Sequence, residues 1–276
     1  MGWHGHLQLD YTRDGDRTIA LDRHHGPLRV LQRLYPEGDS ICHHVLVHPP
    51  GGIAGGDVLA LDGQLASGTH AVITTPGATR FYRSAGPLAE QQVHFTLADG
   101  ARLEWLPLET IAYPSCQVDN TLRFDLAPTA QLMGWDLLAL GLPAAGQAWT
   151  GGRYAQRLEL PGRWLERGVL DSADRLLLDS PLGLAGHGVL ATLFLADGAA
   201  MTRTRREDLL EAARERIEAS PLAPQAGVSA LDEGLIVLRV LADRVEPAMT
   251  LLQQVRAAWR PLHWGLPAHT PRIWRM

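Results

Sequence analysis

The sequence predicts a mainly β fold, in which many short strands and hairpins form stacked sheets of β-helix or sandwich type, with two α-helices in the C-terminal half. Three observations lead to this prediction. Asp-Gly pairs recur, short runs of alternating apolar residues fill the first 200 residues, and 28 glycines and 18 prolines are distributed along the chain. No internal repeat or linker divides the sequence, so residues 1–276 are expected to form a single β-rich domain.

The strands are predicted from period-two alternation and from the turn residues that bound it. Asp-Gly occurs at residues 14–15, 62–63, 99–100 and 197–198, and this pair favours the type I′ turn of a β-hairpin. The clearest hairpin prediction covers residues 92–106, where alternation continues on both sides of Asp99-Gly100. Glu104 is out of phase with its apolar neighbours there, which predicts a solvated or groove-facing side chain. Further strands are expected at residues 28–33, 41–47, 58–61, 71–75, 121–126, 154–160, 189–195 and 235–241.

Two helices are expected, near residues 205–219 and 247–260. The sequence Thr204-Arg205-Arg206-Glu207 fits a capping box and is followed by an apolar face of helical period. The second helix begins with Pro247, which a first turn tolerates. Arg256 and Arg260 fall in its last turns, where the helix dipole favours cations.

The charge composition excludes several classes of function. All 25 residues of the Lys+Arg class are arginine, so the chain can form neither a P-loop nor a lysine Schiff base. The net charge of −5 argues against a nucleic-acid-binding protein, which usually carries a basic face.

The chain is expected to be cytoplasmic, without a membrane segment or a signal peptide. Its longest apolar stretch, residues 131–146, is interrupted by Asp136 and Pro143 and is too short for a membrane helix. Cys42 and Cys116 are far apart in the sequence, and we favour two free thiols over one disulfide.

Metal and catalytic motifs are weak. Cys42, His44 and His48 would share one face of a strand and could hold zinc or nickel, although ordinary strand histidines are the favoured interpretation. Glu104 and Glu109 leave open an alternative function, a β-scaffold carbohydrate-active hydrolase with two carboxylates. No nucleophile elbow occurs, and we predict no catalytic residue.

Six motifs appear in order along the chain: GPLRV at 26–30, YPEG at 35–38, HPPGGIAGGD at 48–57, TTPGATRFYRS at 74–84, LEWLPLET at 103–110 and PRIW at 271–274. In these motifs the sequence resembles the urease accessory proteins of the UreD family, also called UreH. The resemblance extends from Gly26 almost to the C-terminus. It departs from the family where Arg80 replaces a common Lys and Gln147 replaces a common Glu.

The resemblance implies a mostly β chaperone or scaffold and not an enzyme. Such a protein binds the urease apoprotein and acts with a helical UreF-like protein and a UreG-like GTPase to deliver nickel in a GTP-dependent reaction. Nickel would be in transit through an internal passage, and no cofactor or metal would be tightly bound.

Two groups of residues within the motifs are candidates for these roles. Asp57, Glu104 and Glu109 are candidates for the passage; alternatively, Asp57 caps the glycine-rich turn and Glu104 pairs with an arginine such as Arg80 or Arg102. Candidates for a partner surface, with buried packing as the alternative, are Arg80, Phe81, Tyr82 and Arg83.

Overall fold

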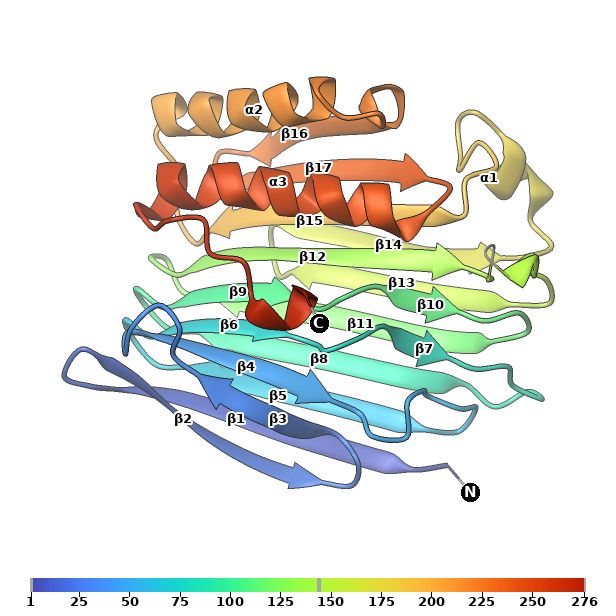
Figure 1. Ribbon diagram of the computed structural model, residues 1–276, viewed down its shortest axis with the longest axis horizontal. Helices are drawn as coiled ribbons and strands as arrows, with labels where there is room; N and C mark the ends of the chain where they lie inside the picture. The colour runs from blue at the N-terminus through green and yellow to red at the C-terminus, as the bar shows by residue number, and fades with distance from the viewer. Residues whose placement is uncertain (1, 143–144, 276) are drawn as a thin grey trace.

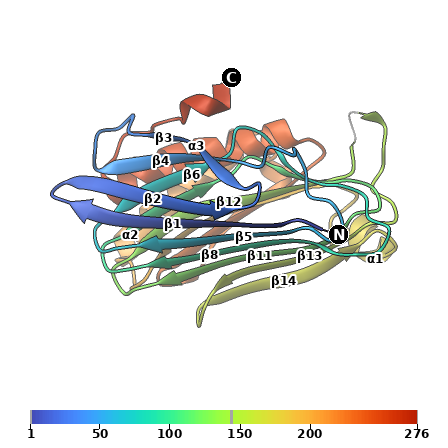
Figure 2. The same ribbon diagram turned by 90° about the horizontal axis from the view of Figure 1, so that it is seen from below.

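The computed structural model describes residues 2–142 and 145–275, and in them two β-sheets face each other (Figures 1 and 2). Sheet A has the strand order β14-β13-β11-β8-β5-β1-β2. Sheet B has the order β16-β17-β15-β12-β9-β6-β4-β3, and β10 and β7 form a branch from β12. The prediction of a mainly β fold with stacked sheets is therefore confirmed, whereas the single domain stays a prediction.

The strands of sheet A are β1 (His4–Asp14), β2 (Arg17–His25), β5 (Val58–Leu65), β8 (Ala89–Leu97), β11 (Gln117–Leu126), β13 (Arg153–Leu160) and β14 (Trp164–Asp171). Those of sheet B are β3 (Arg29–Leu34), β4 (Ile41–Val47), β6 (His70–Thr74), β7 (Thr79–Phe81), β9 (Arg102–Leu106), β10 (Thr110–Ala112), β12 (Gln131–Leu140), β15 (Val189–Asp197), β16 (Ala226–Asp232) and β17 (Leu235–Ala242). All eight strand segments expected outside the Asp-Gly hairpins are present, most of them longer than predicted.

The central strands form successive turns of a β-solenoid. From β5 to β12 the chain passes back and forth between the sheets, and each strand pairs in parallel with the corresponding strand of the next turn. Strand β8, for example, pairs with β5 and β11 in sheet A, while β9 pairs with β6 and β12 in sheet B.

The predicted hairpin at residues 92–106 is therefore wrong. Gly100 has a φ of 69°, as a tight turn requires, but the turn joins strands of opposite sheets. Asp62-Gly63 lies inside β5, and Asp197-Gly198 ends β15 without a hairpin. Only Asp14-Gly15 marks a hairpin in the described residues, between β1 and β2. An Asp-Gly motif predicts that the chain changes direction, but it does not determine which of the two sheets contains the next strand.

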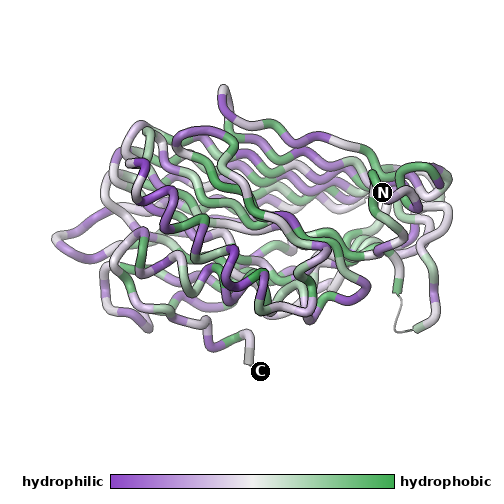
Figure 3. Tube along the Cα trace, turned by 90° about the horizontal axis from the view of Figure 1, so that it is seen from above, coloured by the Kyte–Doolittle hydropathy of each residue, from purple (hydrophilic) through white to green (hydrophobic). Residues whose placement is uncertain are grey.

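The described residues contain the helices α1 (Arg175–Asp179), α2 (Arg203–Glu218) and α3 (Val245–Trp264), with short 3₁₀ turns at Ala223–Gln225 and Arg272–Arg275. The two long helices, α2 and α3, cover the outer face of sheet B, whereas Leu178 of α1 packs in the interior cluster at one end of the sheets. Helix α3 lies over β12, β15 and β17, and α2 packs beside it over β16 (Figure 1). The central strands of sheet B are consequently buried on both faces. Figure 3 shows apolar and polar residues alternating along strands elsewhere.

Both long helices lie close to their predicted ranges, but the capping-box prediction is wrong. The cap of α2 is Thr202, whose hydroxyl accepts a hydrogen bond from the Arg205 amide at 3.3 Å, so Thr204 lies inside the helix. Helix α3 is longer than expected at both ends. Pro247 does lie in its first turn, and Gly265, at a φ of 65°, ends it in the left-handed conformation. None of the helices in the described ranges is long and apolar enough to cross a membrane.

Gly63 shows how tightly sheet A packs on the interior. It pairs with Phe95 across β5 and β8, and a Cβ at this position would overlap the Phe95 ring. We therefore expect Gly63→Ala to lower the free energy of unfolding by about 1–3 kcal/mol, measured by urea denaturation. Gly77 is the matched control, because a Cβ there meets nothing within 4 Å. Equal unfolding midpoints for the two variants would contradict this packing.

Candidate functional site

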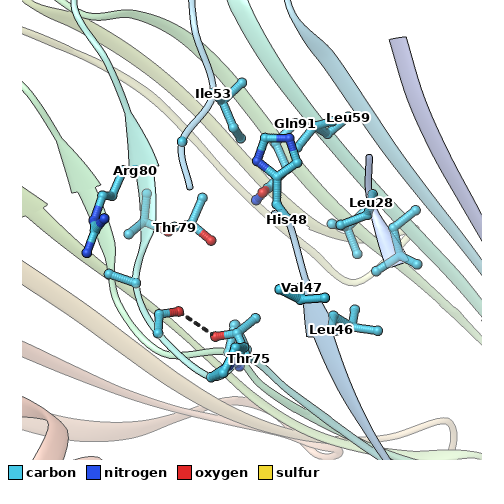
Figure 4. Close-up of a pocket in the computed structure, with 18 of the residues that line it drawn as sticks. Leu28, Leu46, Val47, His48, Ile53, Leu59, Thr75, Thr79, Arg80 and Gln91 are labelled. Atoms are coloured by element: carbon cyan, nitrogen blue, oxygen red, sulfur yellow. Dashed lines mark hydrogen bonds between the residues drawn. The ribbon is translucent and has the colours of Figure 1, made fainter. Parts of the chain in front are cut away.

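A cavity of about 290 Å³ lies between the two sheets and opens beside residues 48–57, which we call the glycine-rich loop (Figure 4). Its walls are mostly apolar and come from both sheets. The charged or polar side chains among the interior lining residues include Gln91 on β8, Thr110 on β10 and Asp136 on β12. The mouth lies between His48, which follows β4, and the segment from Thr75 to Arg80.

The glycine-rich loop forms one side of this mouth because its backbone pairs with β7. The Ile53 amide donates to the Arg80 carbonyl at 2.7 Å, and the Tyr82 amide donates back to the Ile53 carbonyl at 2.9 Å. Gly52 lies so close to the Tyr82 ring that a Cβ would overlap it. Gly52 is therefore needed for the close approach of the loop to the segment that follows β7.

Asp57 closes the same loop. Its carboxylate accepts hydrogen bonds from the Ala54 amide at 2.9 Å and the Trp3 amide at 2.7 Å. The alternative prediction, that Asp57 caps the glycine-rich turn, is confirmed. Asp57 does not line the cavity.

A row of polar side chains leads from the cavity through the otherwise apolar interior. Gln91, Asn120 and Gln156 are register partners on β8, β11 and β13, so they lie side by side on the inner face of sheet A. Gln91 donates to Asn120 at 3.0 Å, and Asn120 donates to the Tyr154 hydroxyl at 2.9 Å. Gln156 donates to Asp136 in the facing sheet.

Sheet B continues the row to the edge of the molecule. Asp136 pairs with Thr192 on β15, which pairs with Arg239 on β17. Arg239 then crosses to sheet A and forms an ion pair with Glu166 on β14. We call Gln91, Asn120, Gln156, Asp136, Thr192, Arg239 and Glu166 the polar layer. It runs from the cavity through the interior to the edge strand β14, where the side chains of Arg239 and Glu166 are exposed.

Asp136 is the ionisable group at the centre of the polar layer, and it is only 8% exposed. Burial raises the pKa of its carboxyl to about 6, and Glu166 adds to this shift, although the Gln156 hydrogen bond opposes it. The indole N–H of Trp105, which lines the cavity, is buried and has no acceptor within the described part of the chain. An acceptor such as water would satisfy it, and the cavity has room for on the order of ten waters.

The sequence did not predict the polar layer. Asp136 was noted there only as an interruption of an apolar stretch. A usable signal existed, because an acid inside a strand that is otherwise buried throughout requires a partner or water. The amide partners Gln91, Asn120 and Gln156 carry no such signal, since their alignment depends on which strands pair.

Glu104 lies on the opposite face of sheet B, fully buried beneath α3. Arg256 and Arg260 each donate to its carboxylate through Nε at 2.9 Å, and His70 approaches it at 3.2 Å. Burial alone would raise the pKa of Glu104, but Arg256, His70 and Arg260 outweigh that effect and hold it well below its ordinary range. The prediction of a solvated or groove-facing Glu104 is therefore wrong. The alternative, that Glu104 pairs with an arginine, is confirmed, but the partners are Arg256 and Arg260 and not Arg80 or Arg102. Helix α3 covers the face that alternation marks as exposed.

Arg260 extends this group to Glu37, which also accepts a hydrogen bond from His43 at 2.8 Å. Burial opposes ionisation of Glu37, yet His43 and Arg260 lower its pKa to about 2. We call Glu37, His43, His70, Glu104, Arg256 and Arg260 the buried ion network. Arg256 and Arg260 serve in it as counter-ions, whereas the sequence suggested only a role at the helix end.

Glu109 lines a separate groove of about 570 Å³ beside the start of α3, together with Ile111, Glu246 and Met249. Glu109 and Glu104 thus share no cavity, and the Glu104 oxygens are already held by arginines. A buried, permanently paired carboxylate cannot act as acid or nucleophile, so the hydrolase alternative has no structural support.

The four candidate partner residues have different environments. Arg80 and Arg83 are exposed, and Tyr82 is half-buried with its ring 5.2 Å from that of Tyr113. Phe81 is 0% exposed and packs on Tyr154, which excludes it from a surface. Its inclusion was wrong because residues alternate between the two faces of β7.

Cys42, His44 and His48 do not form the metal cluster that was the less favoured interpretation of their spacing. Cys42 and His44 point into the interior, where the Tyr11 hydroxyl lies 2.7 Å from His44 Nδ1, and burial lowers the pKa of His44 to about 4. His48 lies instead at the cavity mouth. Over residues 2–142 and 145–275, no group of three potential ligands is arranged to hold a metal ion. Cys42 and Cys116 are both free and buried, as predicted.

An interior cavity joined to a row of polar side chains is an arrangement that can bind a small ligand or ion. A model of the family described as "UreD urease accessory protein" matches residues 4–275. The chain is 65% identical to the urease accessory protein UreD of Leptothrix cholodnii, covering 100% of each chain. It is 55% identical to that of Variovorax paradoxus over 99% of each chain.

This chain belongs to the UreD family of urease accessory proteins. It is an accessory protein, as the sequence predicted, and its role concerns urease.

The buried ion network should make stability depend on pH in a defined direction. Because the folded-state pKa of Glu37 is lowered, its stabilising contribution is present above about pH 4.5 and is lost as pH falls towards about 2. We expect Glu37→Gln to cost about 3–5 kcal/mol at pH 7 and to flatten the decline over that range. Urea unfolding, monitored by tryptophan fluorescence at several pH values, measures the loss of stability at pH 7 and the decline at lower pH. A variant within 0.5 kcal/mol of the parent at pH 7 would contradict the network.

For Asp136 we expect the opposite dependence of stability on pH. Its raised pKa means that ionisation destabilises the fold as pH rises from about 3.8 to about 6. Asp136→Asn should therefore be more stable than the parent at pH 7.5, by about 1–3 kcal/mol, with the difference vanishing near pH 4. Asp119→Asn, at an exposed position beside Asn120, should show no such pattern in the same thermal and urea measurements.

Proposed function

We propose that this chain is a maturation chaperone and scaffold that binds the urease apoprotein in the cytoplasm and mediates nickel delivery to its active site. It would act with a helical UreF-like protein and a UreG-like GTPase. GTP hydrolysis is assigned to the latter, because a chain without lysine cannot form a P-loop. Nickel is the cargo, and no tightly bound cofactor is part of the proposal.

The observation that carries the proposal is the polar layer. It provides a buried carboxylate, Asp136, among amide and hydroxyl oxygens and a second carboxylate, Glu166, at the edge, in a path that begins at a cavity large enough for water. Such oxygen ligands suit weak and replaceable binding of a divalent ion, whereas a cluster of imidazoles or thiolates would retain nickel. A conduit needs weak, replaceable oxygen ligands.

The geometry changes the proposed passage residues. Asp57 and Glu104 already have structural partners, and Glu109 lines the groove beside α3. Asp136 takes their place in the proposal, with Gln91 and Asn120 on the cavity side and Glu166 at the edge. The ends of this path would lie at the mouth beside His48 and at the edge strand β14.

Nickel loading of urease tests this function. Urease purified from cells that lack this chain should contain little nickel. When such cells are supplied with Asp136→Asn, their urease should contain at least ten-fold less nickel per active site than urease from cells supplied with the parent chain. The charge that would attract the ion is removed, while the variant fold is expected to be more stable at neutral pH, so misfolding would not explain the loss.

Asp119→Asn is the matched control, since it removes an exposed acid from β11 of the facing sheet, next to Asn120, and should restore nickel fully. Fully loaded urease in cells without this chain would end the proposal as a whole. Full loading with Asp136→Asn would end only the assignment of the passage.

A further inference from the structure

His48 supplies an imidazole at the mouth of the cavity. Of the twelve histidines and two cysteines in the sequence, His48 is the one that lines this cavity in the described residues. Its ring lies on the opposite side of the mouth from Thr79 (Figure 4). The polar layer contains neither residue type, and the ligands it offers a cation are amide, hydroxyl and carboxylate oxygens. A cation that passes from the mouth into the polar layer therefore meets an imidazole only at His48.

The backbone of His48 is fixed on both sides. Val47, the last residue of β4, precedes it, and Pro49 and Pro50 follow it. A residue before proline is restricted to extended conformations, and each proline holds its own φ at about −65°. The Gly51 amide donates to the His48 carbonyl at 2.9 Å and closes a turn over the two prolines. A rigid turn thus presents the ring at the mouth.

The imidazole of His48 is available to a metal ion. Within residues 2–142 and 145–275, no group hydrogen-bonds to its ring. The four buried histidines of the same ranges are each hydrogen-bonded through the ring; they are His43, His44, His70 and His263. Partial burial lowers the pKa of His48, although Asp57 opposes the shift. The ring is therefore neutral at pH 7, with a lone pair free for a metal.

Oxygen ligands by themselves do not favour nickel. Carboxylate, carbonyl and water oxygens suit Mg²⁺, Ca²⁺ and Mn²⁺, whereas imidazole suits nickel, zinc and copper. We propose, on the basis of the function above, that His48 is the first protein ligand of nickel at the mouth and thereby selects nickel over magnesium and manganese. Imidazole accepts zinc as well, so this selection does not extend to zinc.

A single imidazole also allows the ion to move on. Over the described ranges no second histidine or cysteine lines the cavity, and His48 belongs to no group of three ligands arranged around a metal. Water would complete the coordination of the ion, and affinity falls with the number and charge of the protein ligands. Gln91 and Asp136 line the same cavity and would replace His48 as the ion moves inward.

The nickel dependence of urease loading tests the proposal. We would titrate nickel in purified mixtures of urease apoprotein, the proposed partner proteins, GTP and one of four chains: the parent, His48→Gln, His48→Ala or His24→Gln. His24 is an exposed histidine of β2 outside the cavity and is the matched control. The nickel concentration for half-maximal loading should rise at least about ten-fold in both His48 variants, because the first ligand is lost. The maximum loading should stay within about two-fold, since the polar layer is intact, and His24→Gln should match the parent.

Competition by manganese tests the selection. With nickel at the half-loading concentration of each chain, Mn²⁺ should inhibit His48→Gln at an about ten-fold lower concentration than it inhibits the parent, because an amide oxygen does not discriminate against hard cations. Zn²⁺ should inhibit the parent at least as strongly as it inhibits the variant. Thermal unfolding of His48→Gln should match that of the parent, because its ring has no hydrogen bond to lose in the described part of the chain.

Chemical protection locates the metal ion on the isolated chain. Diethyl pyrocarbonate modifies neutral imidazole, and mass spectrometry of peptides reports each histidine separately. Ni²⁺ should slow the modification of His48 by about five-fold or more at a concentration at which Mg²⁺ has no effect.

Parent-like responses of His48→Gln to nickel and manganese would overturn the proposal. So would a His48 ring that nickel does not protect or that the reagent does not reach. These failures are distinguishable from failure of the proposed function. If cells lacking this chain make nickel-free urease while His48→Gln behaves as the parent does, the assignment of the first ligand is wrong and the function stands.

Discussion

The buried ion network beneath α3 is the interaction on which the rest of the structure depends. Glu104 lies in the middle of sheet B, and its counter-ions Arg256 and Arg260 come from a helix more than 150 residues later in the chain. Burying these charges is favourable only when every partner is present, because removal of one leaves another uncompensated. The same arginines donate to the Pro267 and His269 carbonyls, so the network also fixes the C-terminal segment.

Closure of the outer face of sheet B determines what the interior can contain. With α3 in place, strands such as β12 are buried on both sides and are almost continuously apolar. Burying polar groups inside is then costly unless they are hydrogen-bonded, and here Gln156 donates to Asp136, while Gln91 donates to Asn120 and Asn120 donates to the Tyr154 hydroxyl. The solenoid provides the alignment, because parallel register places equivalent residues of successive turns side by side.

Local features of the structure could be predicted from the sequence, and long-range ones could not. Alternation located the strands, and Asp57 could be identified as a cap because its partner Ala54 is three residues away. Alternation also gave the correct phase of Glu104. It could not show that a distant helix would cover that face, or that the turn at Gly100 would lead into the opposite sheet. The polar layer could not be predicted for the same reason, because strand pairing determines which of its residues lie side by side.

The distance in sequence between Glu104 and its arginines has a consequence for synthesis. A ribosome adds about 5–20 residues per second, so on the order of ten seconds separate the appearance of β9 from that of α3. During this interval Glu104 lacks its counter-ions, and the apolar outer face of β12 has no cover. The nascent chain therefore exposes an apolar sheet face until α3 has been synthesised. Strands made early in synthesis thus depend on a helix made much later to bury their outer face.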